Sequence, residues 1–410
     1  MGENRLAELL QETAAPIAAP SLAEAAWAQA RRVRRRRYAT VCASAAVAVL
    51  AVTAATVLPL GGRDLPNPPT TATTPAQRPV AHPMPGTLPR RAIAPLPANS
   101  TGMAPPDARK LSEHPLDRAV AVVQPYGPEG SSAVQPVYAL GTDGTWVRVD
   151  VVDLVLASDA HGNHGIPLTG SALSPDRRRI ALPQPGSLVV VDLTTAKAHR
   201  IAVPGFNEQV LWWGNRTVLV GQGGPGAVAV DWAAGTATAT TTGLSVGDSA
   251  WPASEGAPVT ELTEEAREGQ RARLSVRQWP PGRAEPVSDV PVDDTGLGPQ
   301  HGVLGWNGPA IGDGAERVVR AGWGISGTYH GVEMLAVVNT RTGVVERMLD
   351  LGRDRYKGCC RALDWIDRDT VLAQTDKEGV IAWDLRTGAV TQVVAGPLPA
   401  ALAVRLHDGS

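Results

Sequence analysis

The chain has 410 residues and a formal net charge of −2, from 38 Lys and Arg against 40 Asp and Glu. A chain so close to neutral has no overall field that attracts nucleic acid, so we expect no nucleic-acid partner. Its three cysteines are too few to form a disulfide framework in a chain of this size.

Residues 1–37 are predicted to form a short helical segment in the cytoplasm. Leu6, Leu9 and Leu10 fall on one helix face at the i, i+3, i+4 spacing. This face is either an interfacial surface or a docking site for a cytoplasmic protein partner. The segment contains no histidine, and no cysteine precedes Cys42, which excludes a zinc-binding anti-sigma domain.

Residues 38–58 carry no charge and are predicted to form one transmembrane helix. About 20 residues at ~1.5 Å each cross a hydrocarbon core of roughly 30 Å. The positive-inside rule places the N-terminus in the cytoplasm and the rest of the chain outside. The arginines that set this orientation directly precede the span: Arg31, Arg32, Arg34, Arg35, Arg36 and Arg37.

The alternative for residues 38–58 is a cleaved signal peptide, with Val52-Thr53-Ala54 as a small-residue cleavage site. A long segment precedes the apolar run, and the run exceeds a signal core of about 7–15 residues. We therefore favour a single-pass protein of the cell membrane with an extracytoplasmic C-terminal domain.

Residues 59–115 are rich in Pro, Thr and Ala and are predicted to be an extracytoplasmic linker. Proline at this density excludes a helix interior and a central strand. An extended, semi-rigid spacer is the expected conformation, and it would hold the following domain away from the membrane.

Residues 116–410 consist of short apolar runs separated by Gly, Asp and Asn turns, which is typical of an all-β domain. A repeated unit has an apolar strand that ends in Asp or Asn, with a glycine four residues later. The acid or amide can accept backbone N–H groups, and the glycine suits the left-handed position that closes a hairpin. The units end at Asp192, Asp231, Asn339 and Asp384, and the glycine is replaced by Ala196 in the first.

The repeat spacing of about 40 to 60 residues is that of one four-stranded propeller blade. Six candidate third strands fit the pattern: 145–150, 187–192, 226–231, 273–278, 334–339 and 379–384. We predict a six-bladed β-propeller. Seven blades are possible if residues 119–123 and 401–406 are used differently, and a β-sandwich is the alternative fold.

The Ser174-Pro-Asp176 phrase and the Trp383-Asp384 strand end resemble WD-repeat and Tol-type bacterial propellers over roughly residues 117–406. The whole layout resembles actinobacterial single-pass membrane proteins with an extracytoplasmic propeller, some of them encoded beside alternative sigma factors. The resemblance implies the fold and an accessory role in sigma-factor signalling, but no activity.

Cys359 and Cys360 are adjacent, and outside the cytoplasm they can close a vicinal disulfide. Such a bond would stiffen the loop at Gly358 or act as a redox switch. Two reduced thiols, or crosslinks to other chains, are the alternatives. Cys42 is expected to be a small apolar residue of the membrane span.

Two clusters of polar residues are interpreted as solvated turns rather than metal sites, because each offers few ligands. The tryptophans recur at blade positions and are interpreted as core residues rather than as an aromatic ligand platform. We therefore predict no catalytic, cofactor-binding or metal-binding residues. The clusters are Asp159, His161, Asn163, His164 and Asp293, Asp294, His301, and the tryptophans are Trp212, Trp213, Trp251, Trp306, Trp365 and Trp383.

The leading functional hypothesis is a membrane-anchored interaction or sensor module. It would bind a protein on a propeller face and a cytoplasmic partner through residues 1–37. The rival hypothesis is a propeller-type envelope enzyme, a lyase or glycoside hydrolase, with a site at the blade axis. Asp248 and Asp364 are its scattered candidate acids.

Overall fold

The computed structural model describes residues 78–128, 133–159, 162–252, 256–266 and 271–407. Its helices are three short 3-10 turns, η1 (Ser100–Gly102), η2 (Val246–Asp248) and η3 (Thr295–Leu297). Within the described ranges no helix has the length and apolarity needed to cross a membrane. The predicted Leu6, Leu9, Leu10 face, the arginine cluster and the 38–58 span lie outside these ranges.

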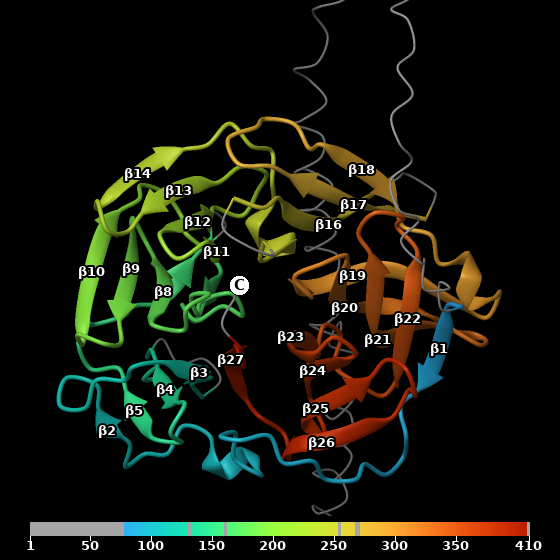
Figure 1. Cartoon of the computed structure of the whole chain (residues 1–410), viewed down its shortest axis with the longest axis horizontal. Helices are drawn as coiled ribbons and strands as arrows, with labels where there is room; N and C mark the ends of the chain where they lie inside the picture. The colour runs from blue at the N-terminus through green and yellow to red at the C-terminus, as the bar shows by residue number, and fades with distance from the viewer. Residues whose placement is uncertain (1–77, 129–132, 160–161, 253–255, 267–270, 408–410) are drawn as a thin grey trace, which may run out of the picture. The chain divides into compact units, whose positions relative to one another are not determined.

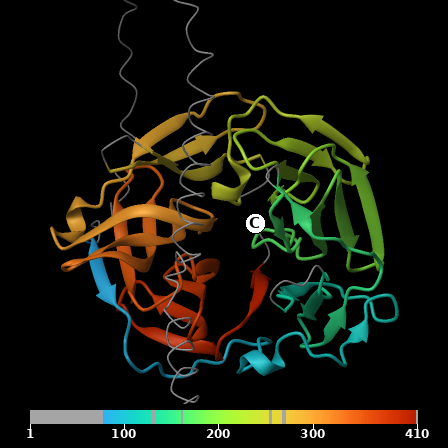
Figure 2. The same ribbon diagram turned by 180° about the vertical axis from the view of Figure 1, so that it is seen from behind.

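Six sheets stand round a central axis, as Figures 1 and 2 show from opposite sides. With strands given from the axis outwards, blade 1 consists of β27 (Ala400–Val404), β3 (Ala119–Pro125), β4 (Tyr138–Gly141) and β5 (Trp146–Arg148). Blade 2 consists of β8 (Arg179–Gln184), β9 (Ser187–Asp192) and β10 (Lys197–Ala202). Blade 3 consists of β11 (Gln209–Trp213), β12 (Thr217–Gly221), β13 (Val228–Asp231) and β14 (Thr236–Ala239). A backbone bridge from Leu173 to Ile180 fills the inner position of blade 2.

The other three blades are continuous four-stranded meanders. Blade 4 consists of β15 (Ser249–Ala250), β16 (Val259–Glu265), β17 (Arg273–Trp279) and β18 (Ser288–Pro291). Blade 5 consists of β19 (His301–Gly312), β20 (Arg317–Ser326), β21 (Tyr329–Asn339) and β22 (Val345–Gly352). Blade 6 consists of β23 (Arg361–Asp367), β24 (Thr370–Thr375), β25 (Gly379–Asp384) and β26 (Val390–Ala395). A separate hairpin of β6 (Ala157–Ser158) and β7 (His164–Gly165) lies between blades 1 and 2 in sequence.

The C-terminal strand closes the ring. β27 pairs antiparallel with β3, with Leu402 opposite Val123, so the two ends of the propeller share one blade. The predicted six blades are therefore confirmed. Residues 119–123 and 401–406 do not build a seventh blade, and the sandwich alternative is wrong.

Five of the six predicted third strands coincide with or overlap β9, β13, β17, β21 and β25, although β13 begins two residues later than predicted. The prediction for 145–150 is wrong, because β5 is the fourth strand of blade 1 and β4 is the third. In this blade the Asp143-Gly144 turn precedes the predicted strand, whereas in the other units the corresponding turn follows it.

The core consists of aliphatic side chains between neighbouring sheets, together with buried tryptophans, two of which link inner strands. The Trp212 indole donates to the Ala172 carbonyl at 2.8 Å, and the Trp365 indole donates to the Ile311 carbonyl at 3.1 Å. Each bond joins the inner strand of one blade to that of the preceding blade. Trp251, Trp306 and Trp383 are also buried, and Trp213 is half-buried, so these residues pack in the core as predicted.

The described part of the predicted linker runs along the outer edges of three blades. β1 (Val80–Pro83) adds parallel to β22, and β2 (Arg109–Lys110) adds parallel to β5. Between them, backbone bridges join Arg90 and Asn99 to β26. An added edge strand needs hydrogen bonds on one side only, so it tolerates proline. Residues 78–111 are therefore packed against the propeller, and residues 59–77 lie outside the described ranges.

The antiparallel meander gives the propeller two different faces. Connections between first and second strands, and between third and fourth strands, emerge on one face, which we call the turn face. Connections between second and third strands, and from blade to blade, emerge on the other, which we call the loop face.

Candidate functional site

The turn face is built from polar side chains that bond their own backbone. Asp192 accepts from the Thr194 and Thr195 amides at 3.0 and 3.1 Å, and Asp384 accepts from the Arg386 and Thr387 amides at 2.9 Å each. Asp231 and Asn339 make the same pair of bonds. Burial alone would raise the pKa of Asp192, but these hydrogen bonds and Arg179 lower it. The side chains of Asp192, Asp231, Asn339 and Asp384 therefore stabilise their own turns.

The loop face carries most of the exposed large apolar side chains of the described residues. Among the described residues, the exposed large apolar side chains are Val80, Tyr126, Val155, Phe206, Val287, Tyr329 and Tyr356. Five of them, Tyr126, Val155, Phe206, Tyr329 and Tyr356, lie in or beside loop-face connections. Val287 lies on the turn face and Val80 on the outer rim. Exposed aromatic side chains gathered on one face are typical of a binding surface.

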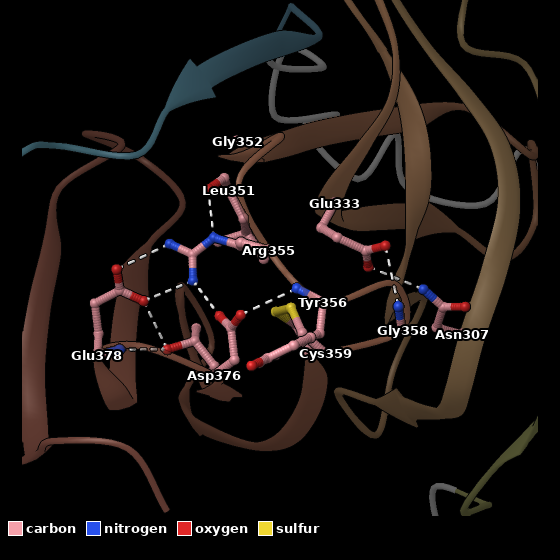
Figure 3. Close-up of a disulfide and its surroundings, with 12 residues drawn as sticks. Asn307, Glu333, Leu351, Gly352, Arg355, Tyr356, Gly358, Cys359, Asp376 and Glu378 are labelled. Atoms are coloured by element: carbon pink, nitrogen blue, oxygen red, sulfur yellow. Dashed lines mark hydrogen bonds and ion pairs between the residues drawn. A yellow bond between two sulfur atoms is a disulfide. The ribbon is translucent and has the colours of Figure 1, made fainter. Parts of the chain in front are cut away.

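The connection 353–360, from β22 to β23, presents the most exposed of these residues. Tyr356 is 80% exposed. The neighbouring Arg355 side chain is only 4% exposed, and its guanidinium bridges Asp376 at 2.7 Å and Glu378 at 2.8 and 2.9 Å (Figure 3). Burial alone would raise the pKa of Glu378, but hydrogen bonds from Arg355 and Thr375, together with the charge of Arg355, lower it. The buried ion pair therefore ties the connection to the β24–β25 turn.

Three backbone amides of the same connection are also bonded. The Tyr356 amide donates to Asp376 at 3.2 Å, and the Gly358 amide donates to Glu333 at 3.0 Å (Figure 3). The Cys359 amide donates to the Tyr356 carbonyl at 2.9 Å. Tyr356 is therefore a solvent-exposed ring on a fixed backbone.

In the structure Cys359 and Cys360 are joined by a disulfide with an S–S distance of 1.92 Å. Cys360 is 2% exposed and packs in the apolar core. Both sulfurs and a carboxylate oxygen of Asp376 lie within 4.8 Å of one another, which is close enough to hold a metal ion. Metals bind thiolates, so the intact disulfide offers Asp376 alone as a ligand.

Cations on the same connection as Tyr356 lie over aromatic rings of blade 5. Arg353 lies 4.6 Å from the centre of the Tyr329 ring, and Lys357 lies 5.2 Å from that of Trp323. At the start of β23, Arg361 donates to the Tyr126 hydroxyl at 3.2 Å. We call this group, together with Tyr356, Asp354 and Lys377, the Tyr356 patch.

A shallow pocket of about 350 Å³ lies elsewhere on the loop face. Two polar side chains line it, and the Ser158 hydroxyl lies 3.0 Å from His164 Nδ1. The lining residues are Val134, Leu154, Val155, Leu156, Ser158 and His164.

The predicted polar clusters are turns where they are described. Asp159 accepts from both the amide and the side chain of Asn163, at 2.9 and 2.7 Å. His161 lies outside the described ranges. Asp293 accepts from Thr295, whereas Asp294 accepts from the Val303 amide and pairs with Arg271, so the second cluster is divided between separate partners.

The two candidate acids of the enzyme hypothesis have different partners. Asp364 accepts from the Leu406 amide at 2.6 Å, and burial raises the pKa of Asp364 to about 6. Asp248 pairs with Arg320 and accepts from the Ser245 hydroxyl.

A third acid, Glu261, bonds the Ser245 amide at 2.8 Å, so it lies near Asp248. Glu261 is only 3% exposed, and burial raises its pKa to about 7. Two carboxylates facing a substrate are what glycoside hydrolysis requires. Asp248 is paired with Arg320, and Glu261 accepts from the Ser245 amide and the Trp279 indole, so both acids have partners within the fold.

No protein-family model and no curated protein sequence matches the chain. Among solved structures, the dihydro-heme d1 dehydrogenase NirN in complex with DHE is similar at 12% identity and a TM-score of 0.37. The match covers 68% of this chain and 56% of that protein. Similarity at this level carries no inference about a ligand or a reaction.

Sequence reasoning missed the Tyr356 patch. One signal was present, because Lys357 and Lys377 are two of only four lysines in the chain. The cationic and aromatic residues of the patch come from three separate blades, so sequence spacing alone does not bring them together.

Proposed function

We propose that the protein is a membrane-anchored extracytoplasmic interaction module whose loop face binds a protein partner. The observation that carries this proposal is Tyr356, 80% exposed on a connection fixed by the buried Arg355 ion pairs. A rigidly held exposed aromatic loses little conformational entropy on binding, and aromatic residues dominate binding energy at protein interfaces.

Photo-crosslinking in the native host tests the loop face. A photoreactive phenylalanine analogue replaces Tyr356 in the full-length chain, and the same analogue replaces Val287 as the control. Val287 is 55% exposed but lies on the turn face. We expect a discrete protein adduct from position 356 and none from position 287. Equal adducts from both positions, or none from any exposed loop-face residue, would contradict the proposal.

The anchoring half of the proposal rests on the uncharged run 38–58 and the preceding arginines. The disulfide supports an oxidising compartment for the propeller. A reporter fused after residue 77 should be active only outside the cytoplasm, and the full chain should resist alkaline extraction from membranes. Release of a mature protein that begins near Ala55 would favour the cleaved signal peptide.

The sensor half requires a cytoplasmic partner for residues 1–37, and a sigma factor is the specific candidate. Full-length protein with Leu6, Leu9 and Leu10 replaced by serine is compared with the native chain in co-purification from the host. If both proteins retain the same cytoplasmic partner, the face formed by Leu6, Leu9 and Leu10 does not bind that partner.

A further inference from the structure

We infer that the Tyr356 patch binds an extended acidic segment of a protein, with an apolar or aromatic side chain of that segment packed on Tyr356. This inference rests on the proposed function and names the chemistry of the partner. It is argued from the charges, the aromatic rings and the rigidity of the patch.

The exposed charged side chains of the Tyr356 patch are mostly positive. Lys357 and Lys377 are exposed, and the Arg353 side chain is 62% exposed. A single exposed carboxylate, Asp354, belongs to the patch, and it lies 3.9 Å from Arg353. An incoming acidic segment therefore meets cations first, which steers its approach.

The carboxylates beneath the patch are already engaged. Asp376 and Glu378 share the Arg355 guanidinium, and they are only 10% and 22% exposed. Glu333 accepts from the Gly358 amide and the Asn307 side chain, and its burial raises its pKa. These acids hold the connection in place through bonds to Arg355, Tyr356 and Gly358.

The aromatic rings place the cations before any partner arrives. Stacking on Tyr329 and Trp323 restricts the long side chains of Arg353 and Lys357, so less entropy is lost when they pair with a carboxylate. Tyr356 stands between these side chains along the chain and supplies an apolar surface. The patch thus matches alternating acidic and apolar side chains of an extended segment.

The experiment selects peptides from a phage-displayed library of random dodecapeptides against the immobilised full-length chain. We expect a consensus rich in Asp and Glu around an aromatic or aliphatic residue. The synthetic consensus peptide should bind about tenfold more weakly to Tyr356→Ala and to the double variant Arg353→Glu/Lys357→Glu. Added salt should also weaken its binding.

Lys197→Glu is the matched control, because Lys197 is an exposed lysine on the outer strand of blade 2. It should bind the peptide like the native chain. Circular dichroism and thermal unfolding of each variant establish that the fold is retained.

The inference is overturned if no acidic consensus emerges, or if the consensus peptide binds both patch variants normally. Binding that is lost in Phe206→Ser or Val155→Ser instead would overturn the inference and leave the loop-face proposal intact. If no loop-face variant changes peptide binding and position 356 gives no photo-adduct, both the inference and the loop-face proposal are overturned. Dextran sulfate is a second probe: its binding through the same cations without any selected peptide would identify an anionic polysaccharide and overturn the inference.

Discussion

The turn face and the loop face of the propeller use their polar side chains in opposite ways. On the turn face, Asp192, Asp231 and Asp384 bond the backbone within three residues of themselves. On the loop face, Arg355 and Glu333 bond across connections and leave Tyr356 and its neighbouring cations facing solvent. The polar groups of the turn face are used within the fold, whereas the loop face presents exposed aromatic and cationic side chains on a fixed connection.

The largest expected effect comes from removing the cation that holds the loop face. Arg355→Met leaves Asp376 and Glu378 as buried, uncompensated carboxylates, which typically costs about 3–5 kcal/mol. Urea unfolding measures this loss. The triple variant Arg355→Met/Asp376→Asn/Glu378→Gln is the control, since it removes the charges together and should recover much of the stability. A change below about 1 kcal/mol in the single variant would contradict the buried ion-pair network.

The next effect concerns the turn face. Asp192→Ala leaves the Thr194 and Thr195 amides without their acceptor, and we expect a loss of about 1–3 kcal/mol. Asp192→Asn should cost less, because Asn339 forms the same turn in blade 5.

The Asp192 effect depends on pH in a defined direction. The folded-state pKa of Asp192 lies below its ordinary value of 3.8, so its contribution is present above that value. The contribution is lost as the pH falls through the folded pKa. The difference between native protein and Asp192→Ala should therefore shrink in unfolding experiments below about pH 4. A constant difference from pH 7 to this range would argue against the charged turn.

The sequence predicts the turn face far better than the loop face. An Asp or Asn followed four residues later by Gly is a local signal, since the turn is complete within that stretch. The error at 145–150 arises because β3 finds its inner partner, β27, at the other end of the chain. A pattern of residues within one stretch of sequence does not predict pairing between strands at opposite ends of the domain.

The outer belt and the Tyr356 patch depend on contacts between distant segments. The proline content of residues 59–115 indicates an extended chain, but it does not distinguish a free spacer from a strand added at a sheet edge. The adjacent cysteines are visible in the sequence. Arg355 has no sequence signal, because Asp376 and Glu378 approach it only when blades 5 and 6 pack together.

Substituting one exposed residue on each face compares the two faces directly: both substitutions should change stability little, and only the loop-face substitution should change binding. Tyr356→Ser and Val287→Ser each remove an exposed side chain, so each should change the free energy of unfolding by less than about 0.5 kcal/mol. Only Tyr356→Ser should lose the consensus peptide. Equal loss of binding in both variants would show that the comparison between the faces does not describe function.

The smallest expected effect is that of the disulfide. Cys359 and Cys360 are adjacent, so their bond encloses no further residues and constrains the unfolded chain very little. We expect Cys359→Ser/Cys360→Ser to change global stability by less than about 1 kcal/mol. The Gly358 and Cys359 amides should exchange hydrogen faster, while the amides of β24 stay unchanged, because Arg355 still ties the connection to the β24–β25 turn. Mass spectrometry of envelope-derived protein should find a two-hydrogen deficit on the peptide that carries both cysteines. Two freely alkylated thiols would exclude the bond, and a stability loss as large as that of Arg355→Met would contradict the small contribution expected of it.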